Sequence, residues 1–168
     1  NLSLRDLYHF AETLLPEDCR KIVETYCQHK DVRGNRRNKP GRGLEFGYPI
    51  TFDLIGDFGI YRDLQRHRML TQQHQLLTPY LGYSIPEEVI DARLAWKFKA
   101  CISYSEELYE LLFKNCGPAV AQYAVLFLFN IRWYMGMNYR EAFHLMELRT
   151  IPQGHPSYRK LAQQMHTK

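Results

Sequence analysis

The chain has 168 residues, of which 45% are hydrophobic and 14% aromatic, and its 22 basic and 18 acidic side chains give a net charge of +4. This length predicts one domain with room for a small additional element, and the apolar content excludes global disorder. The mild positive charge is not by itself a sign of nucleic-acid binding.

Several kinds of site and segment find no support in the sequence. The most apolar stretch, residues 119–131, contains Gln122 and is too short for a membrane span, so it predicts a buried element. There is no HExxH or GxSxG motif, the histidines lack a close carboxylate pattern, and no metal site is predicted. The cysteines show no compact metal spacing, and we expect a cytoplasmic protein with reduced thiols; they are Cys19, Cys27, Cys101 and Cys116.

The N-terminal part, residues 1–44, is predicted to hold helices followed by a basic linker. Residues 3–30 have helical periodicity, with Ser3 as a cap and Pro16 opening a second segment. Residues 31–43, "DVRGNRRNKPGRG", combine five cationic side chains with glycine and proline, which predicts a loop. That loop is either a solvated connection or a cationic arm for phosphate or nucleic acid.

The remainder, residues 45–168, is predicted to form an α+β domain. Residues 48–56 alternate apolar and polar side chains like a strand, residues 57–67 fit a short helix, and residues 69–78 fit an extended piece. A long helix is predicted over residues 86–115, with acidic residues in its first turn and "CGP" ending it. An extended segment at 132–138, a helix at 139–150 and a turn with a short helix at 152–166 complete the predicted elements.

The first candidate site is the triplet Arg66, His67 and Arg68, followed by the polar run "TQQHQ". Arginine presents a planar fork of donors that suits phosphates and ring carbonyls, and histidine can donate to a ring nitrogen or carbonyl. The alternative is structural, with Arg66 paired to Asp63 or Glu147 and His67 satisfied in a core.

The second candidate site is the set Asn138, Arg140, His144 and Arg149 within the predicted helix. Arg140 and His144 are four residues apart and therefore neighbours on one face, whereas Arg149 faces another way near the helix end. The structural alternative is a capping Asn138 and a surface network from Arg140 to Glu147.

Taken together, these two sets resemble the flavin-dependent thymidylate synthases. That family carries Arg-His-Arg after a strand with a Thr-Phe pair, here Thr51 and Phe52. Its C-terminal signature of Asn, any residue, Arg and an apolar helix ending in Leu-Arg is similar to "NYREAFHLMELR", residues 138–149. The resemblance covers roughly residues 45–164.

The resemblance implies an antiparallel sheet flanked by long helices in a homotetramer or pseudo-tetramer, with FAD where subunits meet. It implies transfer of a methylene group from methylene-tetrahydrofolate to dUMP and reduction by flavin that NADPH recharges. From the charge and the lack of a spanning segment, we expect neither a membrane nor a nucleic-acid partner. By position, the flavin-binding residues would be Thr51, Arg66, His67, Arg68, Asn138, Arg140 and His144. The substrate-binding residues would be Gln73, Gln122 and Arg149, and Arg149 would also be catalytic by stabilising charge that develops on the uracil carbonyl.

The sequence departs from the family where dUMP phosphate should bind. Leu76 replaces a serine, Gln122 an arginine and Asp63 a glutamine, and residues 73–74 and 78–79 also differ. A dianionic phosphate needs several charge-assisted donors, and these substitutions remove such donors. The predicted flavin-binding residues therefore match the family pattern better than the residues predicted to bind the nucleotide. A catalytically degenerate relative is therefore the alternative to a synthase, and a nucleic-acid module using residues 33–42 is a third hypothesis.

The pattern is also similar to a subgroup of synthase-like proteins with two such domains in one chain. The sequence begins at Asn1 without a methionine, and we expect it to be the second of two such domains. A partner domain would then supply the missing contacts.

Overall fold

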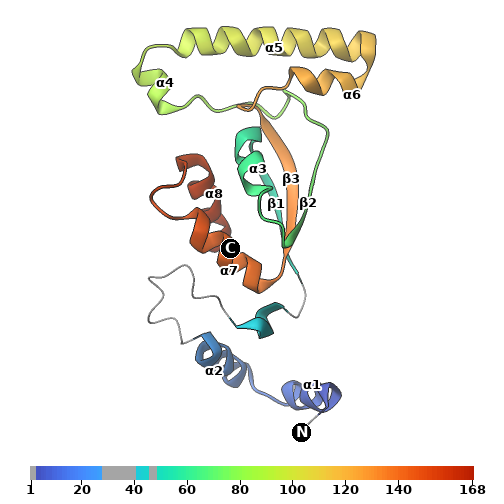
Figure 1. The fold of residues 1–168 in the computed structure, drawn as a ribbon, viewed down its shortest axis with the longest axis vertical. Coiled ribbons are helices and arrows are strands. Elements are labelled where there is room, and N and C mark those ends of the chain that lie inside the picture. Colours follow the sequence, from blue (N-terminus) through green and yellow to red (C-terminus); the bar gives the residue numbers. More distant parts are fainter. Residues whose placement is uncertain (1–2, 28–40, 46–48) are drawn as a thin grey trace.

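The computed structural model describes residues 3–27, 41–45 and 49–168, which form two N-terminal helices and an α+β unit (Figure 1). The elements in chain order are α1 (Leu4–Glu12), α2 (Pro16–Cys27), η2 (Arg42–Glu45), β1 (Ile50–Asp57), α3 (Phe58–Leu64), β2 (Leu70–His74), α4 (Glu87–Asp91), α5 (Ala95–Cys116), α6 (Pro118–Ala121), η3 (Gln122–Ala124), β3 (Asn130–Met137), α7 (Tyr139–Arg149) and α8 (Pro156–His166). Ser3 caps α1 through a capping box with Asp6, and Pro16 opens α2, as predicted. Most of the predicted basic loop, residues 31–40, lies outside the described residues.

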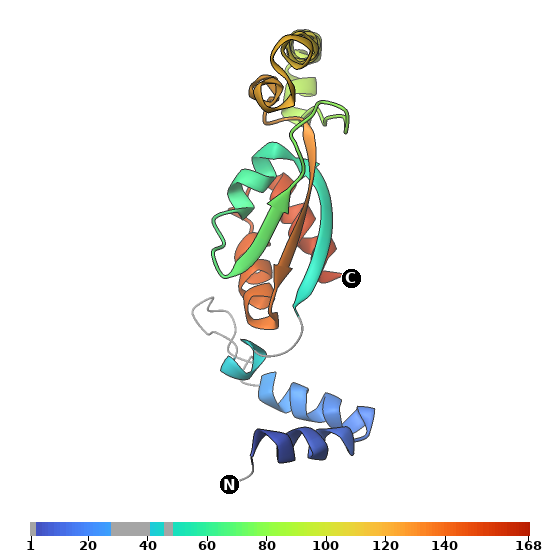
Figure 2. The same cartoon turned by 90° about the vertical axis from the view of Figure 1, so that its right-hand side faces the viewer.

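The strands form an antiparallel sheet in the order β1-β3-β2. The central strand β3 alternates strictly, with Ile131, Trp133, Met135 and Met137 buried on one face. Helices α3, α7 and α8 cover that face, and no other described element lies on the opposite one (Figures 1 and 2). The predicted α+β class and the antiparallel sheet are thus present.

Within the described residues, the buried apolar side chains form one core, which lies between the sheet and these helices and extends to α5, α6 and η3. Its largest fully buried side chains are Leu64, Phe129, Trp133, Met135, Met137 and Leu145. Leu145 comes from α7 and Leu64 from the end of α3, so the core fixes both helices against the sheet. The first candidate site directly follows α3 and the second forms α7, and the core therefore sets the distance between them.

The predicted helix over residues 86–115 is divided in two, so that prediction was wrong. Arg93 has a left-handed backbone with φ of 57°, the N–H of Leu94 donates to the carbonyl of Val89, and the N–H of Arg93 donates to that of Ile90. This pair of bonds is a Schellman motif that ends α4, and α5 starts in a new direction. Glycine usually fills the left-handed position, so an arginine there gave no sequence signal for the break.

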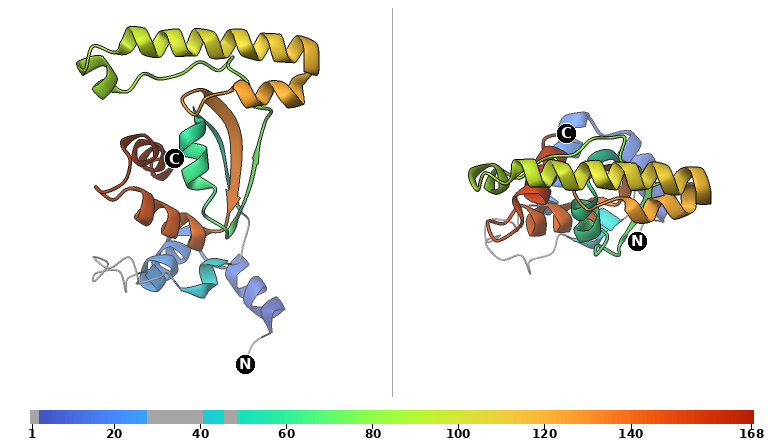
Figure 3. Two further views of the ribbon diagram at one scale, coloured as in Figure 1. Left: turned by 45° about the horizontal axis from the view of Figure 1, so that its top comes forward. Right: turned by 90° about the horizontal axis from the view of Figure 1, so that it is seen from above.

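Helix α5 extends across one end of the sheet and packs on α6 (Figures 1 and 3). Its inner face buries Ile102, Ser105 and Tyr109, and the Ser105 hydroxyl donates to the Ala124 carbonyl at 2.5 Å. Many apolar side chains of this region remain exposed within the chain; they include Trp96, Tyr104, Leu108, Leu111, Phe113, Val120, Tyr123 and Phe127. Exposed apolar surfaces of this kind mark interaction sites or ligand-binding grooves.

The apolar stretch 119–131, predicted as a buried element, is split among α6, η3, a short connection and the start of β3. Ala121 and Phe129 are fully buried, whereas Tyr123 is 89% exposed. Within the described residues, no helix is both long and apolar enough to cross a membrane.

Asp57 caps α3, and we expect its charge to destabilise the fold at neutral pH. Its Oδ1 accepts from the N–H of Ile60 at 2.7 Å, but burial raises the pKa of this carboxyl above the ordinary value of 3.8. Because the folded state then binds more protons, the contribution of Asp57 to stability is present below about pH 4 and is lost as pH rises through the folded pKa. Asp57→Asn keeps a capping acceptor without the charge, whereas Asp57→Ala removes the cap at a cost of about 1 kcal/mol.

Urea unfolding at a series of pH values tests this. The free energy of unfolding of Asp57→Asn, relative to the wild type, should rise with pH from about 4. A difference that stays flat or falls with pH would show that the carboxylate is stabilised by its surroundings.

Candidate functional site

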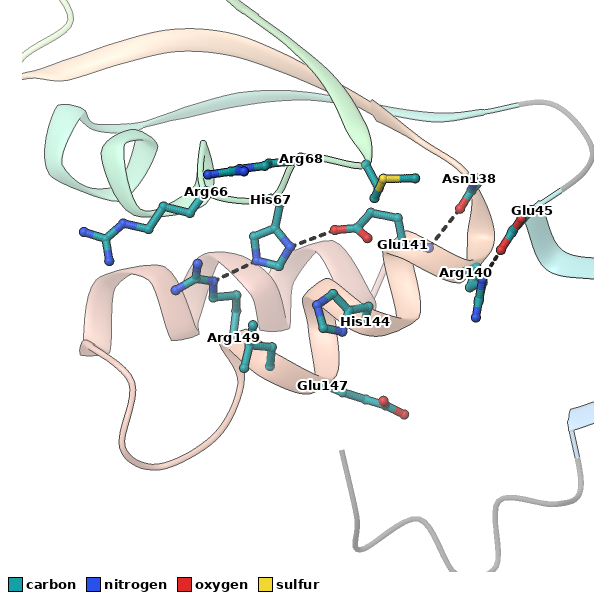
Figure 4. Close-up of a pocket in the computed structure, with 12 residues that line it drawn as sticks. Glu45, Arg66, His67, Arg68, Asn138, Arg140, Glu141, His144, Glu147 and Arg149 are labelled. Carbon is teal, nitrogen blue, oxygen red and sulfur yellow. Dashed lines mark hydrogen bonds and ion pairs between the residues drawn. The ribbon is translucent and has the colours of Figure 1, made fainter. Parts of the chain in front are cut away.

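A cavity of about 490 Å³ lies between the segment that follows α3 and the inner side of α7 (Figure 4). It is lined by Glu45, Arg66, His67, Arg68, Met69, Asn138, Arg140, Glu141, His144, Glu147, Leu148 and Arg149. The two candidate sites, about 70 residues apart in the sequence, therefore meet at one place. The core that packs α3 and α7 on the same sheet face brings them together.

His67 lies at the centre of this site and is only 7% exposed. Its Nδ1 is 2.7 Å from Oε1 of Glu141, and its Nε2 is 2.9 Å from Nε of Arg149 (Figure 4). Its ring also contacts the ring of His144, with centroids 5.6 Å apart. Both ring nitrogens are thus engaged by protein groups, and neither is left for a ligand while these bonds hold.

Arg149 is held on three sides. Besides the bond to His67, its Nη2 donates to the Asp63 carbonyl at 2.8 Å, and its guanidinium carbon lies 5.2 Å from the centre of the Tyr158 ring. A guanidinium carries five N–H donors, and Arg149 gives only two of them to other described residues. The others remain for a ligand in the cavity.

The Asn138 side chain caps α7, with its Oδ1 accepting from the N–H of Glu141 at 2.9 Å. The capping role proposed as a structural alternative is therefore present, and Asn138 also lines the cavity. The amide nitrogen makes no hydrogen bond within the described part of the chain. Asn138 can consequently serve as a cap and still donate to a ligand.

The other arginines of the cavity differ in how far they are neutralised. Arg140 forms an ion pair with Glu45 of η2, which fastens the start of the domain to α7. Arg66 is mostly exposed and lies 3.6 Å from Asp63, one of the two pairings foreseen for it. Arg68, within the described residues, makes no ion pair or hydrogen bond, so it is the cation most available to an anionic ligand.

Three further predicted residues lie away from this cavity in the single chain. Thr51 and Gln73 are on the open face of the sheet, where Gln73 accepts from the Tyr134 hydroxyl at 2.5 Å. Gln122 accepts from the N–H of Leu77 at 3.0 Å, and Leu76 beside it is 58% exposed. None of these three residues lines the cavity formed by the described part of the single chain.

Glu141 and Glu45 were not among the predicted site residues. An acidic residue in the first turn of a capped helix is the usual complement of the helix dipole, so Glu141 carried no separate signal. The one pattern that could have indicated burial of Glu141 was its position one turn before Leu145, on the apolar side of α7. Glu45 is 95 residues from Arg140, and nothing in its local sequence indicates that pair.

Residues 37–168 match the sequence profile of the family described as "Thymidylate synthase complementing protein". The chain is 43% identical over 157 residues to a protein of Chlamydia muridarum named "UPF0159 protein", covering 94% of this chain and 29% of that protein. It is 41% identical to a UPF0159 protein of Chlamydia pneumoniae, covering 96% and 30%, and 32% identical to one of Thermoplasma acidophilum, covering 83% and 28%.

The chain thus spans about three tenths of the length of these relatives. The family profile includes every element from β1 onward and both sets of residues that line the cavity. The chain belongs to the thymidylate synthase complementing protein family.

Proposed function

We propose that this chain binds FAD and a uracil nucleotide in the Arg66–Arg149 cavity and takes part in the reductive methylation of dUMP to dTMP. The convergence of the two signature segments on one cavity carries the proposal, because each segment alone is unspecific. Membership of the family supports a thymidylate synthase-related function for the chain.

The side chains of the cavity suit a flavin. FAD presents a pyrophosphate and a ring system with carbonyl oxygens and nitrogens, and such groups call for cationic and neutral N–H donors. The cavity offers Arg68 and the amide nitrogen of Asn138 for this purpose, and its volume lies in the usual range for ligand sites. When bound, the flavin would supply the hydride, methylene-tetrahydrofolate the carbon, and NADPH the reducing power.

The protein's own contribution would be placement and charge. Arg68 and Arg66 at the rim would attract the pyrophosphate, and Asn138 would donate to the ring system. Arg149, with its guanidinium fixed by His67 and Asp63, would donate to a uracil carbonyl as negative charge develops there.

An oligomer completes this proposal. The open face of the sheet and the exposed apolar side chains of α5 and α6 support a contact with another subunit or domain of the same fold. Such a contact would carry Thr51, Gln73 and Gln122 to a neighbouring cavity, in a tetramer or pseudo-tetramer of the kind predicted from the sequence. We also propose a cytoplasmic location, where folate and NADPH are at hand.

Visible absorbance of the purified chain tests the function most directly. We expect a flavin spectrum, either as purified or after adding FAD, and a shift of the flavin band when dUMP is titrated. A spectrum that ignores dUMP would mean another substrate, in keeping with Leu76 in place of the serine. A chain that takes up no FAD would refute the proposal and leave a degenerate relative that supports an active partner.

A further inference from the structure

The contacts of His67 define its protonation. Arginine keeps its charge in proteins, so Nε of Arg149 is a donor and Nε2 of His67, at 2.9 Å, must be the acceptor. The proton of a neutral ring is then on Nδ1, where it donates to the Glu141 carboxylate at 2.7 Å.

The other two states of the ring conflict with these contacts. In the tautomer protonated on Nε2, the Nε2–H of His67 would face the Nε–H of Arg149, so two donors would meet. The bare Nδ1 would face the Glu141 carboxylate, so two acceptors would meet. The doubly protonated ring would also set an N–H against Arg149. Only the Nδ1–H tautomer satisfies both neighbours, and an outer hydrogen bond of this kind is what fixes the tautomer of a histidine.

The three groups also balance in charge. Glu141 is 8% exposed, and a buried carboxylate is unfavourable unless it is hydrogen-bonded and compensated. Its hydrogen bond comes from His67, and its compensating charge is Arg149 on the far side of the ring. The three residues Glu141, His67 and Arg149, which lie in a row along the cavity, therefore act as one unit (Figure 4).

We propose that Glu141 is a positioning residue: it holds His67 as the Nδ1–H tautomer, so that the bare Nε2 fixes the Arg149 guanidinium at the cavity. The effect of this unit on turnover rests on the proposed function, but the tautomer itself does not.

The test is the ¹⁵N spectrum of the imidazole rings in the intact chain, which distinguishes protonated from bare ring nitrogens. The His67 signals are assigned by their loss in His67→Asn. In the wild type at neutral pH, we expect a protonated Nδ1 and a bare Nε2. A protonated Nε2 in the wild type would overturn the proposal without any variant having to fold.

Variants then test whether Glu141, and not another carboxylate of the cavity, determines the tautomer of His67. Glu141→Met removes the acceptor at similar volume and should convert His67 to mixed tautomers, which should shift the Nε–H signal of Arg149. Glu141→Gln keeps an acceptor oxygen and should restore the Nδ1–H pattern. Glu147→Met, which removes another carboxylate from the same helix and cavity, should leave the His67 signals in place. Unchanged His67 and Arg149 signals in Glu141→Met would overturn the proposal.

If the chain has synthase activity, the turnover of the Glu141 variants gives an independent test of the positioning role. Glu141→Met should lower kcat by about 10- to 100-fold, the usual effect of losing an outer partner that orients a ligand-binding group. FAD affinity should change little, because Glu141 points at His67 and not at the rim. Absence of flavin or turnover in the wild type would refute the proposed function, while the ¹⁵N spectrum would still decide the positioning role.

Discussion

Replacing Arg149 with alanine is expected to lower kcat for dUMP methylation by about 10²- to 10³-fold while FAD binding is retained. A preorganised donor aimed at charge that develops in the transition state contributes in this range. Arg149 fits that role because His67, Asp63 and the Tyr158 ring hold its guanidinium before any ligand arrives. Steady-state kinetics with flavin titration on the same protein measures both quantities.

Arg68→Ala is expected to lower turnover at limiting FAD, through weaker flavin binding. Its guanidinium has no partner within the described residues, so its loss should cost little stability. One charge-assisted hydrogen bond contributes about 1.5–3 kcal/mol, which corresponds to a loss of FAD affinity of about 10- to 150-fold. The two variants should therefore have different effects: Arg149→Ala should lower kcat, and Arg68→Ala should lower the affinity for flavin.

Arg62→Ala is the matched control, because Arg62 is an exposed arginine of α3 that does not line the cavity. It changes the net charge by the same amount and should leave kcat and flavin affinity unchanged. The unfolding free energy of Arg149→Ala should fall by about 1–3 kcal/mol, because the hydrogen bonds to His67 and Asp63 are lost together with the charge that compensates Glu141. Full activity in both Arg149→Ala and Arg68→Ala would show that these site assignments are wrong.

Much of the fold could be predicted from local patterns. Alternation over residues 48–56 indicated β1, residues 57–67 fitted the short helix α3, and Pro16 marked the start of α2. These signals work because each depends on the backbone and on neighbours within a few residues.

The features that sequence could not supply depend on distant partners or on rare backbone states. Arg93 adopts a left-handed conformation without being glycine, and so the break between α4 and α5 was missed. The pair of His67 with Glu141 joins residues 74 apart, and neither residue departs from its local role. Pairs of this kind follow from how α3 and α7 pack on the sheet.

The two interpretations of the candidate site also turn out to be compatible. The structural alternative for His67 is present, since the ring is buried and hydrogen-bonded on both sides. The same bonds hold Arg149 at the cavity, so satisfying the histidine is part of building the site. A buried, fully bonded residue can thus act on a ligand through its neighbour.

The second large effect is expected at Trp133, where alanine should lower the free energy of unfolding by about 3–5 kcal/mol. Trp133 is 1% exposed on the central strand, between Leu54 of β1 and His74 of β2. Its ring packs edge-on against Tyr61, with centroids 5.7 Å apart, and approaches Gly56 so closely that a Cβ there would lie 3.3 Å away. Its removal would leave a cavity bounded by the strands and α3, which cannot collapse without moving the sheet. Urea unfolding followed by circular dichroism measures the loss.

The chemistry of the indole predicts how a smaller substitution behaves. The buried Nε1 of Trp133 has no hydrogen-bond partner among the described residues, so the ring contributes through volume and apolar contact. Trp133→Phe removes that unpaired N–H along with part of the ring, and it should therefore cost clearly less than alanine.

Trp96, the other tryptophan of the chain, provides the control because it is 66% exposed on α5. If α5 is free in solution, Trp96→Ala should change the unfolding free energy by no more than about 0.5 kcal/mol, the usual limit for a surface position. If α5 is covered by a second subunit, the loss should grow with protein concentration, because association is linked to folding. A small loss for Trp133→Ala at every concentration would contradict the placement of Trp133 in the core. Measuring both variants over a range of concentrations therefore tests the core of the single chain and the proposed oligomer in one experiment.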